Sequence, residues 1–270
     1  MSKTSVIIPT MKGREDKLKK LLSTLPPDCE RIIVDDENLL LAAKRNKGAK
    51  QAKGTYLLFI DDDNYLKDGA ISEILNSFTE EIGVMGMTAC YHNKKMIVAD
   101  GGSYRYFISG FTSGRRTNQN AFEETEIYEV DEAANAFMIR KDVFEDVGGF
   151  DEINFPIDLD ESDICKRIKD MGYKIVYNPK AICYHDSITY SCIPNFRRPL
   201  NAYFMGRNRV LFSRKHSHCH LVYLIIFMPI FVVFYCAALL YRKNPRMIPH
   251  FLKGVLDGIS GRKQNPYQQI

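Results

Sequence analysis

Three consecutive carboxylates, Asp61, Asp62 and Asp63, follow an apolar run that covers residues 56–60. Because a helical pattern precedes the run, it predicts a buried parallel strand, and ligands of open α/β sheets bind at the carboxyl ends of such strands. Three like charges at one strand end repel one another. A divalent cation held by hard oxygen ligands would offset that repulsion and bring a substrate's phosphates with it. The alternative is a solvated acidic turn that caps the next helix, because a short motif is by itself only a hypothesis.

A second pair of carboxylates, Asp35 and Asp36, follows another apolar run at residues 31–34. Helical patterns alternate with the apolar runs at residues 14–25, 39–52 and 68–78. Strands that alternate with helices predict an α/β fold with a doubly wound, mainly parallel, Rossmann-like sheet and right-handed crossovers. Since both acidic segments end strands of one sheet, they predict one site at its carboxyl edge.

The middle of the chain is less regular. We expect further strands at residues 82–90, 95–99, 137–139, 174–177 and 181–185, and helices at 141–147 and 159–168. In the second of these helices Asp163 and Arg167 are four residues apart, which predicts a structural ion pair on one helix face. The polar segment 101–126 has the composition of a loop near a site, and Arg115 and Arg116 within it would either bind phosphate or lie in solvent.

Eight short segments, taken in order, resemble glycosyltransferase family 2, the inverting nucleotide-sugar transferases with a GT-A fold. The segments are residues 5–10, 34–36, 43–48, 56–63, 148–152, 160–167, 172–173 and 178–181, the last shortly before His185. Each segment alone is unspecific, whereas their order and spacing over roughly residues 3–215 identify the chain as a member. The resemblance implies a GT-A fold, a nucleotide-sugar donor and a divalent metal cofactor, Mn²⁺ or Mg²⁺.

The resemblance also implies roles for the acidic residues at the strand ends. Asp61, Asp62 and Asp63 look like the family's DxD motif. Within it, Asp63 is similar to the metal-binding carboxylate and Asp61 to the carboxylate beside the nucleotide ribose. Asp36 resembles the aspartate that contacts the base. All four residues are therefore expected to bind the donor or its metal.

Further binding residues follow from the same resemblance. Pro9 and Thr10 resemble the nucleotide-facing end of the first strand, and Arg45 resembles the arginine that lines the nucleotide pocket. His185 is similar to a late histidine that in some relatives approaches the metal or the diphosphate. The alternative for His185 is a structural role, since a lone histidine after a strand is more often satisfied by its neighbours.

Asp160 and Glu161 stand where the family has Glu-Asp, whose second residue is the general base. Here that second residue is Glu161, and the reversed order leaves Asp160 as the alternative. A carboxylate opposite the leaving group would take the proton of the acceptor hydroxyl. With one base and no evident second nucleophile, we expect direct displacement with inversion.

The chain departs from the family pattern after the second strand. The family has a Gly-Ser turn, a helix and a third strand before the segment that corresponds to residues 43–48. Here Glu37 and Asn38 run straight into the apolar residues 39–41. That strand is expected to be missing, so recognition of the base is expected to differ.

Residues 221–241 contain no charged or strongly polar side chain. At about 1.5 Å per residue the segment would be about 31 Å long, which matches a bilayer core of about 30 Å, so we expect a transmembrane helix rather than a buried core helix. Pro229 near its middle also permits a re-entrant hairpin. Basic residues flank both ends, so the positive-inside rule does not choose an orientation. Residues 247–259 have the pattern of an amphipathic helix that can lie on a membrane.

We therefore expect four parts: a GT-A catalytic domain at 1–196, a basic juxtamembrane segment at 197–220, the membrane helix at 221–241 and a basic amphipathic tail at 242–270. Seven cysteines without paired spacing indicate reduced thiols, which together with sugar nucleotides place the catalytic domain on the cytosolic side of a membrane. The net charge of +4 is mild. The basic residues crowd towards the C-terminus, which favours an anionic surface as partner there, and no nucleic acid is expected.

Together these features predict a metal-dependent inverting glycosyltransferase. Its donor would be a nucleotide sugar, and its acceptor a membrane-associated, polyprenyl-linked saccharide in glycan or cell-surface polysaccharide assembly. One alternative is a polyprenyl-phosphate sugar synthase, whose acceptor is the lipid phosphate and which needs no base to deprotonate a hydroxyl. An alternative from another class is a non-catalytic protein that binds nucleotide sugars.

Overall fold

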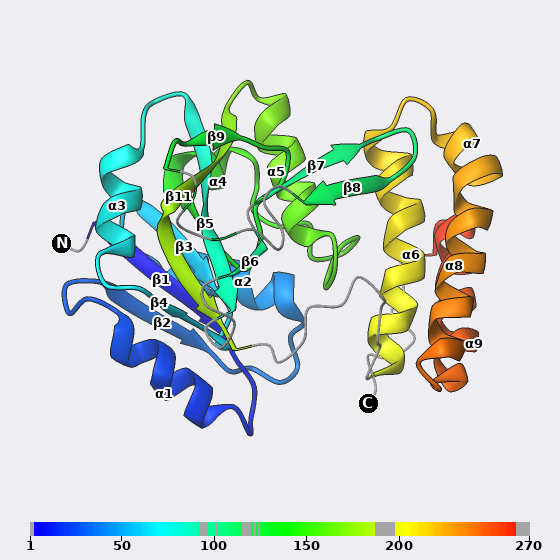
Figure 1. Ribbon diagram of the computed structural model, residues 1–270, viewed down its shortest axis with the longest axis horizontal. Coiled ribbons are helices and arrows are strands. Elements are labelled where there is room, and N and C mark those ends of the chain that lie inside the picture. The colour runs from blue at the N-terminus through cyan, green and yellow to red at the C-terminus, as the bar shows by residue number, and fades with distance from the viewer. Residues whose placement is uncertain are drawn as a thin grey trace. The chain divides into compact units, whose positions relative to one another are not determined.

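Two compact units make up the chain in the computed structural model (Figure 1). The structure describes residues 3–91, 97–100, 102–114, 120, 123, 125–186 and 198–262, so the predicted phosphate-binding pair Arg115 and Arg116 lies outside the described residues. The first unit comprises Met1–Tyr104, Ser113–Phe150 and Glu161–Thr189, and the second comprises Arg105–Thr112, Asp151–Asp160 and Tyr190–Ile270. The second unit thus includes two segments from the middle of the chain, and the predicted division into four consecutive parts stays a prediction.

A mixed sheet of nine described strands forms the core of the first unit. Its path runs β2-β1-β3-β10-β5-β11-β4, with β6 paired to β5 and β9 paired to β11. These strands are β1 (Thr4–Pro9), β2 (Glu30–Val34), β3 (Tyr56–Ile60), β4 (Asn64–Leu66), β5 (Ile82–Tyr91), β6 (Ile97–Asp100), β9 (Tyr128–Glu129), β10 (Ala136–Arg140) and β11 (Lys174–His185). Strands β1, β2, β3, β5 and β11 run in one direction, whereas β10 lies antiparallel between β3 and β5. The predicted α/β fold with a mainly parallel sheet is confirmed.

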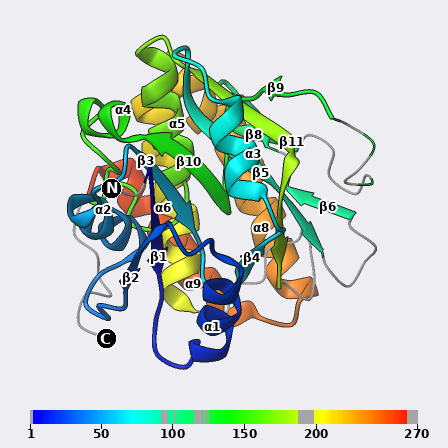
Figure 2. The ribbon, with the colours of Figure 1, turned by 90° about the vertical axis from the view of Figure 1, so that its left-hand side faces the viewer.

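Helices cover both faces of this sheet (Figure 2). The alternation of side chains along β1 decides which face each residue meets, because successive strand residues point to opposite sides. Val6 and Ile8 pack with the helices of one face, and Ile7 packs with those of the other. The first face holds α1 (Glu15–Thr24) and α3 (Ala70–Ser77), and the second holds α2 (Leu41–Gln51), α4 (Lys141–Asp146) and α5 (Asp160–Asp170). The sheet is therefore doubly wound, as predicted.

The last long strand differs from its prediction. Residues 174–177 and 181–185 were expected as two strands, but β11 is one strand from Lys174 to His185. Its register on β5 shifts between Asn178 and Ile182, which leaves room for Pro179, a residue that cannot donate a ladder hydrogen bond. The short strand β4, which the sequence did not indicate, pairs with the end of β11 and brings His185 opposite Asn64.

The link between β2 and α2 is short, as expected. Residues 35–40 are described throughout and contain neither helix nor strand. A tight turn closes the link, because the backbone N–H of Asn38 donates to the Asp36 carboxylate at 3.1 Å and that of Leu39 donates to the Asp36 carbonyl at 3.1 Å. The basic first turns of α2 therefore lie beside the ends of β1 and β2.

The second unit is built from helices, of which α6 (Pro199–His216) and α9 (Ile248–Ser260) lie against each other backbone to backbone. A Cβ atom on Gly254 would lie 2.0 Å from the carbonyl oxygen of Tyr203, and one on Gly206 would lie 2.4 Å from that of Phe251. Any side chain at these two positions would force the helices apart. The unit also contains the tip of a hairpin between β7 (Ser103–Tyr106) and β8 (Phe111–Gly114), and a short 3₁₀ turn, η3 (Pro245–Met247), before α9.

Residues 220–241, which we call the apolar helix, form one continuous helical stretch of 22 residues. It consists of α7 (His220–Val222), the π-helical turn η2 (Tyr223–Phe227) and α8 (Met228–Tyr241). By length and composition it is apolar enough to cross a membrane. The helix runs through Pro229 without a hairpin turn. The wider π turn directly before Pro229 accommodates its ring, which would otherwise clash with the carbonyl four residues earlier.

Candidate functional site

The side chains of the three aspartates after β3 contact different elements of the first unit. A turn follows the strand, because the backbone N–H of Asn64 donates to the Asp61 carbonyl at 3.0 Å. Asp61 meets α2, Asp62 meets the end of β1, and Asp63 meets α1 and the end of β11. The predicted convergence of strand ends at one edge of the sheet therefore exists, although each carboxylate has its own partners.

Arg45 links Asp61 to the predicted base. Its guanidinium Nη2 lies 3.0 Å from Asp61 Oδ1 and 2.7 Å from Glu161 Oε1, and its side chain is fully buried. The guanidinium also lies 5.6 Å from the Phe137 ring centre and 5.5 Å from that of Phe150. A buried cation shared by two carboxylates fixes the distance between them. The structure thus brings together Arg45, Asp61 and Glu161, which the sequence placed in one site.

Asp62 is the most buried carboxylate of the three. It accepts a hydrogen bond of 2.7 Å from the Thr10 hydroxyl, and Arg14 Nε lies 3.1 Å from its other oxygen. Burial raises the pKa of Asp62, against the lowering effects of Thr10 and Arg14. Thr10 is held in turn by Lys44, whose ammonium donates to the Thr10 carbonyl at 2.6 Å and whose pKa is lowered by burial. Asp62 therefore stabilises the end of β1, beside Pro9, through its hydrogen bond with Thr10.

Asp63 is surrounded by basic groups. Arg14 Nη2 lies 2.6 Å from Asp63 Oδ2, Lys17 Nζ lies 3.7 Å from the same oxygen, and His185 Nε2 lies 3.6 Å from Oδ1. Burial acts to raise the pKa of Asp63, but the hydrogen bond and charge of His185, with the charges of Arg14 and Lys17, outweigh it and leave the pKa well below its usual range. Asp63 is therefore held as an anion between α1 and β11.

Asp36 takes a different position from the other predicted residues. Its carboxylate pairs with Lys47 at 2.8 Å rather than with the groups around Asp61–Asp63. The hydrogen bonds from Lys47 and from the Asn38 backbone lower its pKa. Asp36 lies just after β2, and β1 separates β2 from β3 in the sheet.

The predicted catalytic pair starts α5. Asp160 is 3% exposed, whereas the Glu161 side chain is 22% exposed. The two residues before the helix, Asp158 and Leu159, have φ of 66° and 63°, in the left-handed region that non-glycine residues seldom adopt. Further along α5, the predicted ion pair is confirmed: Arg167 Nε donates to Asp163 at 2.8 Å, and the same guanidinium holds the carbonyls of Val147 and Gly149 at 2.7 Å each.

Sequence reasoning missed three basic residues of the site, namely Arg14, Lys17 and Lys44. Arg14 and Lys17 are three residues apart just after β1, so they share one side of the first turns of α1 and could have been noticed by that spacing. Lys44 precedes Arg45 directly. These cations, with Arg45, offset the repulsion among the aspartates. Charge repulsion alone therefore does not require a metal at this site.

Among the described residues, no group of three or more His, Cys, Asp or Glu side chains is arranged to hold a metal ion. Two donors do face each other, the Asp63 carboxylate in the turn after β3 and the His185 imidazole at the end of β11. Carboxylate and imidazole both suit Mn²⁺, and Mg²⁺ is usually bound by one or two carboxylates together with substrate phosphates. The residues present thus fit a cation that takes its remaining ligands from a diphosphate.

Comparison with known proteins identifies the family and the fold. A sequence model described as "Glycosyl transferase family 2" matches residues 11–148, about half of the chain. Among curated proteins no sequence matches.

Solved structures resemble the chain over nearly its whole length. TarS of S. aureus, solved with UDP-GlcNAc, is 16% identical, with 96% of this chain and 81% of that chain covered and a TM-score of 0.61. The mannosyltransferase PcManGT of Pyrobaculum calidifontis, solved with GDP-Man and Mn²⁺, is 12% identical, with 96% and 88% covered and a TM-score of 0.56. GalNAc-T7, solved with UDP, GalNAc and Mn²⁺, is 12% identical, with 96% and 57% covered and a TM-score of 0.53. At these identities the likeness shows a shared GT-A fold.

Proposed function

The chain belongs to glycosyltransferase family 2, and from this we propose that it is a metal-dependent inverting glycosyltransferase that uses a nucleotide-sugar donor and a membrane-associated acceptor. Family membership and the GT-A fold make it an enzyme of sugar transfer rather than a binding protein. The main support is the arrangement around Arg45. This one buried cation contacts both Asp61, the candidate for binding the donor nucleotide, and Glu161, the candidate base.

The donor nucleotide would bind at the ends of β1, β2 and β3. Asp61 would accept hydrogen bonds from the ribose, and Pro9 and Thr10 would line the same end of the sheet. Asp62, held by Thr10 and Arg14, would keep this edge in place. Asp36 is the candidate for base contact, and its pairing with Lys47 means that the base must compete with an ammonium for that carboxylate.

Asp63 and His185 would hold the divalent cation. When bound, the cation would act as a Lewis acid that stabilises the charge developing on the departing diphosphate. Arg14 and Lys17 already stand beside Asp63, so they would supply further positive charge to the same phosphates. The described residues around Asp63 would thus provide both an anionic ligand for a metal and cations for an anionic leaving group.

Glu161 is the candidate general base. Its carboxylate is partly accessible, whereas Asp160 is almost fully buried, so Glu161 is better placed to receive a proton from an acceptor hydroxyl. Removal of that proton while the sugar bond to the diphosphate breaks would give direct displacement with inversion. Arg45 would keep the carboxylate in position throughout the reaction.

The acceptor is proposed to be a polyprenyl-linked saccharide in glycan or cell-surface polysaccharide assembly, with the catalytic domain on the cytosolic side of the membrane. The support is the apolar helix, which is long and apolar enough to enter a membrane. The donor-site residues Asp61, Asp62, Asp63 and Arg45 belong to the first unit, and the apolar helix belongs to the second. Donor binding and membrane association are therefore assigned to different parts of the chain.

The proposal is tested by nucleoside diphosphate release from a panel of sugar nucleotides, with full-length protein in detergent, Mn²⁺ and a membrane-lipid extract. We expect lipid-dependent release of nucleoside diphosphate from one donor. This release should fall by at least about 100-fold in Asp63→Asn, because the metal that stabilises the leaving group would lose a protein ligand. Mn²⁺ binding, followed by electron paramagnetic resonance, should weaken in the same variant. The matched control is Asp142→Asn, which removes an exposed carboxylate paired with Arg140 in the same unit. Release that is equally fast in wild type and Asp63→Asn would contradict the proposed metal role, and bound nucleotide without release from any donor would contradict the proposed reaction.

A further inference from the structure

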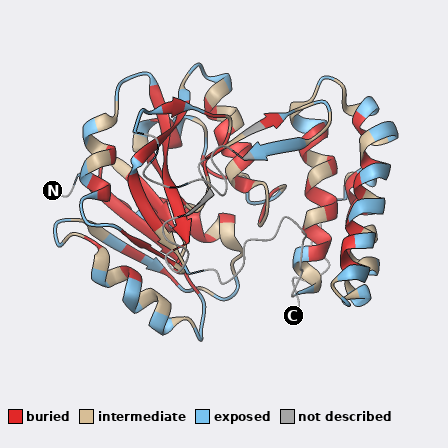
Figure 3. Cartoon of the chain, in the orientation of Figure 1, coloured by how far each residue is buried: buried red, intermediate tan, exposed pale blue. Residues whose placement is uncertain are grey.

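The outer face of the apolar helix is apolar along its whole length. Leu221, Ile225, Ile230, Val233 and Leu240 are between 51% and 73% exposed. Figure 3 shows the exposed outer side of α8 and the buried side that faces α6. Continuous apolar surface of this kind on a folded chain marks contact with an apolar environment.

The inner face of the same helix packs on helices that carry charges. Phe231 lies at the midpoint of residues 220–241, and the Arg209 guanidinium of α6 lies 5.0 Å from its ring centre. The same guanidinium lies 5.3 Å from the ring of Tyr235. Arg209 thus stands beside the middle of the apolar helix, at the position that would be deepest in a bilayer if the helix crossed it.

The apolar helix contacts α9 through apolar side chains, and α9 also carries charged groups that contact α6. Tyr235 packs on Phe251 with ring centres 5.4 Å apart. Two residues beyond Phe251, Lys253 donates to Asp257 at 2.7 Å, and the Tyr203 hydroxyl of α6 donates to the same carboxylate at 3.0 Å. Helices α6 and α9 pack backbone to backbone at Gly206 and Gly254, so they would enter a membrane together.

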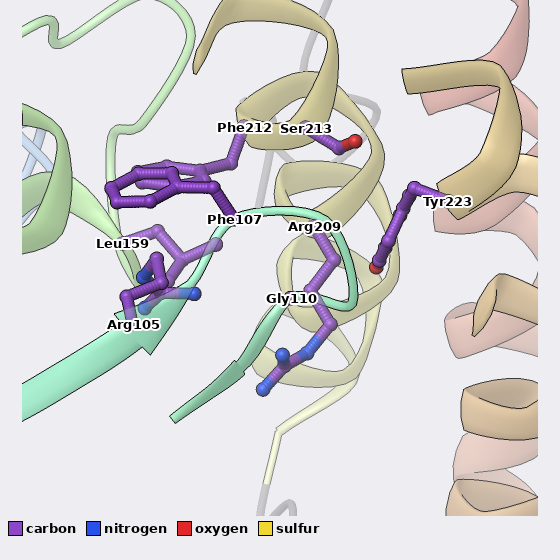
Figure 4. Close-up of a pocket in the computed structure, with 8 residues that line it drawn as sticks. All are labelled: Arg105, Phe107, Gly110, Leu159, Arg209, Phe212, Ser213 and Tyr223. Carbon is purple, nitrogen blue, oxygen red and sulfur yellow. The ribbon is translucent and has the colours of Figure 1, made fainter. Parts of the chain in front are cut away.

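Near its start, the apolar helix contributes Tyr223 to the lining of a small cavity (Figure 4). A cavity of about 10 Å³, room for about one water, is lined there by Arg105, Phe107, Gly110, Leu159, Arg209, Phe212, Ser213 and Tyr223. A Cβ on Gly110 would lie 2.8 Å from the Tyr223 ring. The cavity is too small for a substrate, and its two arginines add to the charged surroundings of the inner face.

We propose that the apolar helix lies along the membrane surface with its outer face in one leaflet and does not span the bilayer. A spanning helix would carry Arg209, Lys253 and Asp257 into the hydrocarbon together with the packed faces of α6 and α9, and each charged side chain there is costly. A helix in the membrane plane buries the same outer face and leaves those charges on the protein side.

The basic residues at the two ends fit the in-plane placement. Arg214 and Lys215 precede the helix, and Arg242, Lys243 and Arg246 follow it. For a spanning helix one of these groups would be on the wrong side under the positive-inside rule. For a helix in the plane both groups lie at the level of anionic headgroups on one side of the membrane. The proposal concerns membrane attachment and stands independently of the glycosyl transfer.

The experiment uses the absence of tryptophan from residues 1–270. Single variants Leu221→Trp, Ile230→Trp and Leu240→Trp place one fluorophore at the start, middle and end of the outer face of the full-length protein. Each is bound to vesicles of phosphatidylcholine and phosphatidylglycerol whose lipids carry bromine at a shallow or a deep acyl position. Ile33→Trp, exposed on β2 of the first unit, is the control that should not be quenched.

The in-plane placement predicts the same shallow quenching profile at all three positions. A spanning helix of 22 residues, about 33 Å long, would instead give deep quenching at residue 230 and shallow quenching at 221 and 240, and that result would overturn the proposal. Absence of quenching at all three positions would also overturn it, because another protein surface would then cover the outer face.

A second variant tests the same face without a fluorophore. Ile225→Asp combined with Val233→Asp should release the protein from the vesicles, because it places two carboxylates among acyl chains, and Lys166→Asp on the first unit should not. Nucleoside diphosphate release in detergent, measured on the same proteins, keeps the outcome separate from the proposed enzymatic reaction. Vesicle binding that is unchanged by the double variant would count against the proposal.

Discussion

Two arginine–asparagine pairs, Arg45-Asn46 in α2 and Arg207-Asn208 in α6, look alike in sequence and differ in what they hold. Both arginines are almost fully buried. In each pair the asparagine fastens a loop: Asn46 exchanges hydrogen bonds of 2.9 Å with the backbone of Phe150, and Asn208 donates to the carbonyls of Ile157 and Asp158 at 2.8 Å each.

The two arginines differ in the charge of the groups that they contact. Arg45 meets the carboxylates of Asp61 and Glu161, whereas Arg207 donates to neutral acceptors, the carbonyls of Asn154 at 2.8 Å and Arg262 at 3.2 Å. A buried cation between two carboxylates holds charges in a partly open site, where a ligand can exchange with them. A buried cation that donates to backbone carbonyls holds a loop in place. Residue type and burial therefore do not distinguish the two arginines, whereas the charge of their partners does.

The largest expected effect falls on the carboxylate beside Arg45. Glu161→Gln keeps the size of the side chain but removes the base, so we expect turnover to fall by about 10²–10⁴-fold while nucleotide binding persists. Asp160→Asn, at a buried carboxylate, should reduce turnover much less. Turnover and nucleotide Kd of the two variants are compared with one donor. Unchanged turnover in Glu161→Gln would instead favour a lipid phosphate as acceptor, since that reaction needs no base.

The next effect concerns stability. Arg45→Met leaves Asp61 and Glu161 facing each other without their shared cation, which should lower the free energy of unfolding by about 3–5 kcal/mol. Arg45→Lys keeps the charge and should recover part of the loss. Urea unfolding followed by circular dichroism measures both variants. A loss below about 1 kcal/mol for Arg45→Met would mean that the two carboxylates do not depend on this cation.

A smaller effect should be common to both asparagines. Asn46→Ala and Asn208→Ala each leave buried backbone groups of a loop without their partner, which should cost about 1–3 kcal/mol of unfolding free energy. Asn76→Ala, at an exposed position of α3, is the matched control and should change little. If Asn208→Ala behaved like the control, the loop before α5 would be held by other contacts.

The smallest effect is a pH dependence in the loop that Arg207 and Asn208 hold. Burial acts to raise the pKa of Asp151, but hydrogen bonds from Lys215 and Asn154 outweigh it and lower the pKa to about 2. Because this pKa is lower in the folded state, the stabilisation is present above about pH 4 and is lost as the pH falls towards 2. Lys215→Met should therefore cost about 1 kcal/mol at neutral pH and progressively less as the pH falls through about 2. Unfolding curves at several pH values test this, and a pH-independent difference would contradict it.

Much of the first unit could be predicted from sequence because its signals are local. The apolar runs before Asp35 and Asp61, and the helical periods between them, indicated the order of elements, and the strands and helices appear within a few residues of those bounds. The antiparallel insertion of β10 could not be predicted, because a buried strand of Phe137, Met138 and Ile139 has the same composition in either direction. Strand β4 was missed because three residues carry no period.

The candidate site shows the same division. Asp61, Asp63, Arg45 and Glu161 could be named as candidates from the sequence because they belong to short segments with characteristic order. Arg14 and Lys17 were missed because nothing in their segment says that the start of α1 lies beside the end of β3. Which carboxylate meets which cation depends on strand order, and strand order depends on contacts between residues far apart in the chain.

By itself, the sequence determined the α/β class, the family, the acidic strand ends and the apolar character of residues 221–241, since each depends on residue type and spacing within a short segment. Only the tertiary structure decided that Arg45 joins Asp61 to Glu161 and that Asp36 stands with Lys47. It alone also placed Arg209 beside the middle of the apolar helix. The physical reason is that charge pairing and helix packing act over a few ångströms in space, whereas the partners lie tens of residues apart along the chain.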